Sequence, residues 1–129
     1  MAAWLVCEDP YGLVRLDSIV SVTAIPLNDR AIPIRRWEEL HPDLRIREAR
    51  RVRIMVAGES GPQMCALTCP GLSVRHAIGQ LVALIENPPG ADDKRRLYVY
   101  GHRRSWGGNA DIWRVAEKLP DPDYPPVRP

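Results

Sequence analysis

The chain has 129 residues, of which 45% are hydrophobic and 26% are charged, a composition that suits one globular domain with a buried core. Its net charge of +2 is too small to require a polyanionic partner. No segment is apolar enough to span a membrane, and the apolar residues 4–7 meet Glu8 too early for a signal peptide. We therefore expect a cytoplasmic protein without a membrane partner.

The chain has few cysteines, and its basic residues are almost all arginine. Three cysteines, an odd number, do not make a disulfide framework, so we expect reduced and buried thiols. Of 18 basic residues only Lys94 and Lys118 are lysine, phenylalanine is absent and prolines number 13. This composition is typical of a GC-rich genome. Arginine clusters in the chain therefore partly reflect codon supply rather than a need for guanidinium groups.

The hydrophobic pattern up to residue 68 predicts short strands separated by turn residues. These strands cover residues 4–7, 13–16, 19–25, 51–56 and 63–68. The first two and the last two flank turn-like segments, so each pair predicts a hairpin. We expect Pro26 to end the third strand because proline lacks the N–H that a ladder needs. Residues 27–48 show no steady period and predict an irregular excursion, with one helical turn at residues 36–40.

The clearest helix signal spans residues 73–87. Its apolar side chains repeat at spacings of 3 and 4, at Val74, Ala77, Ile78, Leu81, Leu84 and Ile85. Ser73 stands where its hydroxyl can cap the first turn, and Asn87 precedes prolines that end the helix. Gly79 costs about 1 kcal/mol relative to alanine in a helix interior, which a close packing contact would explain.

Two more strands are expected after the helix. Residues 97–100 and 112–115 predict a pair across the loop of residues 101–111. Five of the last ten residues are proline, so residues 120–129 predict an extended tail. The sequence thus favours a single α+β domain over residues 1–119, an antiparallel sheet or half-barrel of about 5 to 7 short strands with one main amphipathic helix.

The N-terminal pattern carries a family resemblance. A strand led by Trp4, a turn and the segment 13–22 resemble the opening of small uncharacterised bacterial and phage proteins. Some of these have a pleckstrin-homology-like half-barrel that one helix closes. The resemblance covers residues 4–88 and rests on the patterning of hydrophobic strands. It implies a fold and no reaction, and the two strands after the helix depart from that architecture.

Residues with metal or nucleophile chemistry are few. Zinc takes thiolate and imidazole ligands, and Cys65, Cys69, His76 and His102 provide both types. On one strand the two cysteines would share a face about 13 Å apart, too far for one ion unless the chain bends after Cys69. Cys69 near the helix N-terminus is alternatively a reactive thiol, because the helix dipole favours anions. No base or elbow motif accompanies a serine or cysteine. We expect no metal, no cofactor and no enzyme.

Arginines dominate residues 45–53. Alternation would place four of them on one outward face where phosphates could bind, namely Arg45, Arg47, Arg51 and Arg53. Arg103, Arg104 and Trp106 add cations and a stacking ring, a mixture used on single-stranded nucleic acid. The alternative is a solvated sheet edge whose charges prevent association.

The four tryptophans divide into two groups. Trp4 and Trp113 lie in apolar strands and are expected in the core, whereas Trp37 and Trp106 lie in polar, turn-rich segments. Exposed indoles are favoured interface anchors, although Trp37 could instead cover residues 27–48. The sequence favours a non-enzymatic protein-interaction or assembly module with a protein partner or self-association. The alternative is a nucleic-acid-associated protein that uses the same arginines.

Overall fold

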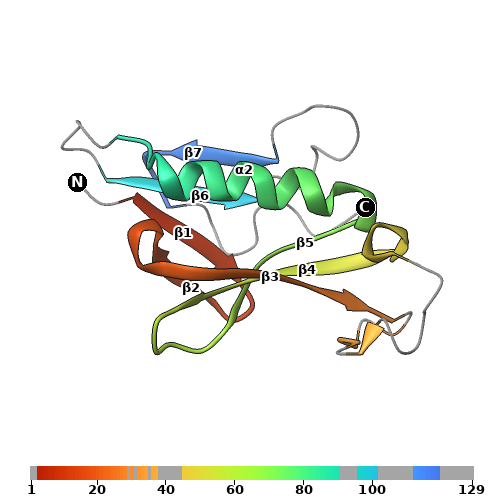
Figure 1. Cartoon of the computed structure of the whole chain (residues 1–129). Helices are drawn as coiled ribbons and strands as arrows, with labels where there is room; N and C mark the ends of the chain where they lie inside the picture. Colours follow the sequence, from red (N-terminus) through yellow and green to blue (C-terminus); the bar gives the residue numbers. More distant parts are fainter. Residues whose placement is uncertain are drawn as a thin grey trace.

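Two hairpins, a third strand pair and one further strand build the two sheets of the fold (Figure 1). The computed structural model describes residues 3–28, 30, 32–34, 36–37, 45–90, 96–101 and 112–119. Within these residues the strands are β1 (Ala3–Glu8), β2 (Tyr11–Arg15), β3 (Ile19–Leu27), β4 (Arg51–Gly58), β5 (Met64–Cys69), β6 (Leu97–Gly101) and β7 (Trp113–Ala116). The main helix is α2 (Val74–Glu86), and the short 3-10 turns are η1 (Leu16–Ser18), η2 (Ile46–Glu48) and η3 (Gly71–Ser73). The predicted α+β class, with mostly antiparallel strands and one main helix, is confirmed.

The strand order differs from a simple series of hairpins. One sheet has the order β2-β1-β6-β7 and the other has the order β3-β4-β5. The predicted hairpins β1–β2 and β4–β5 and the pair β6–β7 are antiparallel, whereas β1 and β6 run parallel, with Trp4 opposite Tyr98. A parallel pair needs a long crossover, which here includes the second sheet and α2. The sequence pattern carries no signal for this pairing.

The two sheets are joined where β1 ends beside β5. Asp9 and Cys65 exchange backbone hydrogen bonds, with the Cys65 N–H 2.9 Å from the Asp9 oxygen and the Asp9 N–H 3.3 Å from the Cys65 oxygen. The Glu8 carboxylate accepts a 2.9 Å hydrogen bond from the Thr68 N–H. These bonds satisfy the edge of β5 that would otherwise be open, so the sheets form one continuous core.

The core lies between the sheets and α2. Its fully buried side chains include Leu5, Leu16, Ile54, Leu67, Leu81 and Val99. In Figure 1 α2 crosses the upper side of the molecule beside β7, above the strands of the second sheet. The predicted apolar stripe of the helix faces this core, because Val74, Ala77 and Leu81 are buried and Ile78 packs against them. No helix among the described residues is long and apolar enough to cross a membrane.

Three local expectations are wrong. Pro26 does not end its strand, since β3 continues to Leu27; β3 is an edge of its sheet and tolerates a residue without an N–H. Ser73 makes no side-chain cap, because η3 leads directly into α2. Gly79 is exposed, and a Cβ built there would meet nothing within 4 Å, so no packing contact within the described chain explains it. The predicted turn at residues 36–40 and the tail at 120–129 lie mostly or wholly outside the described residues.

Candidate binding surface at the arginine end

Four arginines lie at one end of the molecule, where η2 leads into β4. We call this group the arginine end, and it consists of Arg45, Arg47, Arg50 and Arg51, all with exposed side chains. The backbone that carries them is fixed by η3, because the Gly71 N–H donates a 3.0 Å hydrogen bond to the Ala49 oxygen. Ala49 is buried, so the arginines before and after it project from an anchored turn.

The predicted alternation is correct for only part of this surface. Arg45 and Arg47 belong to the start of η2 and not to a strand, so a period of 2 does not govern them. Tertiary packing of η2 on η3 brings them beside Arg51 instead. Arg50 is also exposed at this end, although strict alternation along residues 45–53 places it on the face opposite Arg51.

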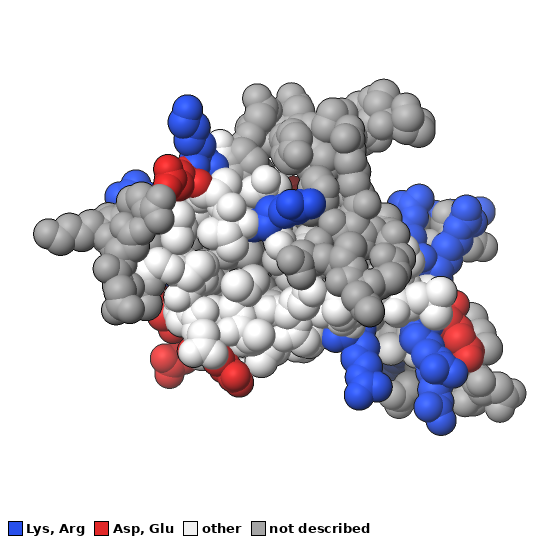
Figure 2. Space-filling model, turned by 90° about the horizontal axis from the view of Figure 1, so that it is seen from above, with Lys and Arg blue, Asp and Glu red and all other residues white. Residues whose placement is uncertain are grey.

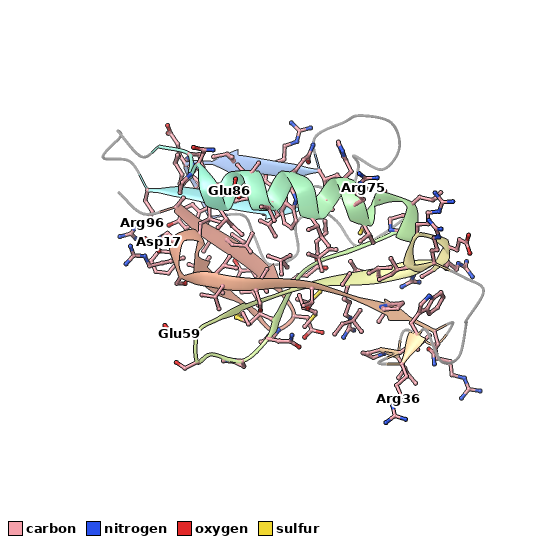
Figure 3. The ribbon with its side chains drawn as sticks, viewed as in Figure 1. Asp17, Arg36, Glu59, Arg75, Glu86 and Arg96 are labelled. Carbon is pink, nitrogen blue, oxygen red and sulfur yellow. The ribbon has the colours of Figure 1, made fainter. Side chains whose placement is uncertain are left out.

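The charges of the arginine end are not neutralised within the described part of the chain. No ion pair to any of its four guanidinium groups is found among the described residues. Glu48 is the nearest acidic residue in sequence, and its carboxylate accepts a 3.3 Å hydrogen bond from the Arg45 backbone N–H. Figure 2 shows blue side chains gathered at the right-hand end of the molecule. In Figure 3, Asp17, Glu59 and Glu86 lie toward the opposite end, where Arg96 also lies.

An exposed leucine lies next to these arginines. Leu72 is 82% exposed, the largest value among the large hydrophobic residues of the described chain. Its neighbour Gly71 lies so close to η2 that an added Cβ would be 2.6 Å from the Ile46 oxygen and 2.8 Å from the Arg47 oxygen. Leu72 is thus held beside the arginine end by backbone packing. Arginine is enriched at protein contact surfaces, which makes the arginine end a candidate contact surface.

Arg53 does not belong to the arginine end. Its guanidinium is 3.8 Å from the Asp9 carboxylate, and its side chain is 28% exposed. Arg53 lies opposite Thr68 and Ile25 in the sheet, where it covers the junction between β5 and the end of β1. The tertiary fold gives this arginine an intramolecular carboxylate partner, which leaves it less suited to bind an external anion.

The described tryptophans differ in burial and in what they contact. Trp37 is half-buried and packs against the hydrophobic core, whereas residues 38–44 of the segment 27–48, which it is expected to cover, lie outside the described residues. Trp113 is buried, and Trp4 is half-buried on β1. The loop candidates Arg103, Arg104 and Trp106 lie outside the described residues.

The three cysteines are buried free thiols. Burial, with a smaller contribution from the neighbouring Cys65, raises the pKa of Cys7 and of Cys69 to about 12 from an ordinary value of 9.0. Burial also raises the pKa of the Cys65 thiol. The thiolate, and not the thiol, acts as nucleophile and metal ligand. A raised pKa keeps these cysteines protonated at neutral pH and therefore weak in both roles. The hypothesis of a reactive Cys69 is therefore not supported.

A bulge in β5 separates Cys65 from Cys69. The register shifts between Ile54 and Met55, so Cys65 lies opposite Met55 while Cys69 lies opposite Val52. Met55 and Val52 face opposite sides of β4, and directly paired residues share a face. The two thiols therefore lie on opposite faces of the sheet. The expectation that they share one face is wrong. No group of metal-binding side chains is found among the described residues.

Comparison with protein-family models, with curated proteins and with solved structures finds no match to this chain.

Proposed function

We propose that this protein is a non-enzymatic interaction module that uses the arginine end to bind an acidic surface of a protein partner. The observation that supports this proposal is the exposed Leu72 beside four arginines without described ion pairs. Carboxylates of a partner would pair with the guanidinium groups in bidentate geometry, and Leu72 would enter an apolar recess. Leucine desolvation would contribute affinity, whereas the arginines would contribute orientation and association rate.

Nucleic acid is the second candidate partner. The same exposed arginines could contact phosphates, which would make binding fall steeply with salt. Two features weaken this candidate relative to the first. Arg53 already has Asp9 as a partner, and an exposed leucine adds nothing to phosphate recognition.

Site-specific photo-crosslinking would test the proposal directly. A photoreactive amino acid at Leu72 should crosslink a defined protein in the source cells, whereas one at Val20 should not. Val20 is a suitable control because it is 66% exposed and lies at the far end of the β3–β4 pair from Arg51.

Charge reversal supplies the second measurement. Arg47→Glu with Arg51→Glu should abolish the Leu72 crosslink, whereas the matched double reversal Arg96→Glu with Arg114→Glu should leave it intact. A crosslink to nucleic acid that disappears on nuclease treatment would favour the second candidate. Equal crosslinking by both double variants would contradict any role of the arginine end.

A further inference from the structure

The outer face of α2 carries an open groove around the exposed Gly79. The groove has a volume of about 560 Å³, and the described residues that line it come from α2 and the turn before it: Leu72, Arg75, His76, Gly79, Gln80 and Ala83. At 3.6 residues per turn, residues 75, 79, 83 and 86 of α2 fall on one stripe around Gly79. Arg75, Gly79, Ala83 and Glu86 are all exposed on this stripe.

The small residues at the centre of this stripe allow a close approach. A Cβ at Gly79 would meet nothing within 4 Å, so the glycine is not needed to pack α2 against its own fold. Packed helices lie about 8–10 Å apart, and the smallest separations need small side chains at the crossing point. A helix that crosses at Gly79 would meet small side chains at the centre of the stripe, at Gly79 and Ala83.

Two charges on the stripe oppose the dipole of their own helix. Arg75 is the second residue of α2, near its positive N-terminus, and Glu86 is its last residue, near the negative C-terminus. The first turn holds no acidic residue and the last turn no basic one. Figure 3 shows Arg75 and Glu86 toward opposite ends of the helix. Among the described residues neither side chain forms an ion pair.

We infer that a second copy of this chain covers this face, with the two α2 helices antiparallel and crossing at Gly79. An antiparallel partner compensates both unfavourable interactions with the helix dipole. Its positive N-terminus lies near Glu86, and its negative C-terminus lies near Arg75. Relative to the crossing point, Arg75 lies four residues before Gly79 and Glu86 seven residues after it. Arg75 of one copy is then offset from Glu86 of the other by about 4.5 Å along the axis, within reach of an arginine side chain.

The contact is self-complementary, as a twofold dimer requires. The Arg75–Glu86 pair occurs twice, once in each direction, while Gly79 faces Gly79. A 13-residue helix is about 20 Å long, so one helix pair buries less than the roughly 1,200 Å² of a stable interface. We therefore expect a reversible dimer that salt weakens. The two proposals meet at Leu72, which lines the groove and lies beside the arginine end. The dimer depends on Arg75 and Glu86 and the proposed function on Arg47 and Arg51, so charge reversals at these two sets of residues distinguish the proposals.

Sedimentation of the full chain, in a concentration series up to about 1 mM, tests the dimer. The wild type should shift toward twice the monomer mass. Arg75→Glu alone places like charges against Glu86 of the other copy, and Glu86→Arg alone places them against Arg75. Each variant should dimerise roughly tenfold more weakly than the wild type.

An equimolar mixture of the two variants gives the decisive comparison. A mixed dimer contains one native Arg75–Glu86 pair and one reversed pair, so it should regain the wild-type association. Gly79→Gln should also abolish the dimer without unfolding the monomer, and Arg96→Glu should have no effect. A wild type that stays monomeric throughout, or a mixture that associates no better than its components, would overturn the inference.

Discussion

The indole N–H of Trp113 donates a 2.8 Å hydrogen bond to the backbone oxygen of Ala77, and both residues are buried. Ala77 belongs to α2 and Trp113 begins β7, so this bond ties the last described strand to the helix. A carbonyl oxygen in a helix has a second lone pair that can accept such a bond.

Trp113→Phe should lower the free energy of unfolding by about 1–2 kcal/mol, because the ring stays buried while the bond is lost. Urea denaturation followed by circular dichroism measures the change. Trp4→Phe is the matched control, since Trp4 is half-buried and its substitution should cost less. Equal effects of the two substitutions would show that aromatic burial, and not the hydrogen bond, determines the cost.

Gln80 provides the second link between α2 and β7. Its Oε1 accepts a 2.9 Å hydrogen bond from the Ile112 N–H, and its Nε2 lies 3.0 Å from His76 Nε2. Gln80→Met keeps the length of the side chain but leaves the buried Ile112 N–H without this acceptor. We expect a loss of about 1–3 kcal/mol in unfolding free energy. Gln80→Glu retains an acceptor for Ile112, so it should cost less, and amide hydrogen exchange at Ile112 should separate the two variants.

Gly71 and Gly79 should respond oppositely to alanine. A Cβ at Gly71 would lie 2.6 Å from the Ile46 oxygen, and backbone atoms cannot move aside as a flexible side chain can. Gly71→Ala should therefore destabilise the protein by about 3 kcal/mol or more. Gly79→Ala meets no atom and should stabilise the monomer by about 1 kcal/mol. Thermal unfolding at low protein concentration checks both signs, and a stabilising Gly71→Ala would contradict the packing of η3 on η2.

The buried thiols should make the protein sensitive to alkaline pH. Cys7 and Cys69 have folded-state pKa values of about 12, above the ordinary value of 9.0. Between pH 9 and about pH 12 the thiols of the unfolded chain lose protons that the folded chain retains. The free energy of unfolding is therefore unaffected below pH 9 and declines above it. Each thiol contributes a slope of up to about 1.4 kcal/mol per pH unit.

Urea denaturation at pH 8, 9, 10 and 11 measures this decline. A variant with Cys7→Ala and Cys69→Ala should show a flatter pH dependence, even if its stability at pH 8 is lower. A thiol reagent at pH 8 should react with the wild type only after denaturant is added. Rapid labelling of the native protein would show that the thiols are accessible.

The sequence alone determined the elements whose signal is local. The 3.6-residue period of residues 73–87 predicts α2 because its positions share a face whatever the partner is. The alternation of residues 51–56 predicts β4, and the turn after it predicts β5, because a hairpin depends only on neighbouring residues.

The tertiary structure decided which residues meet. The parallel pairing of β1 with β6, the bond between Trp113 and Ala77, and the ion pair of Arg53 with Asp9 join residues far apart in the chain. Periodicity reports which face a residue occupies and not what lies against that face. The arginine end likewise depends on the packing of η3 on η2, which a period of 2 along residues 45–53 does not describe.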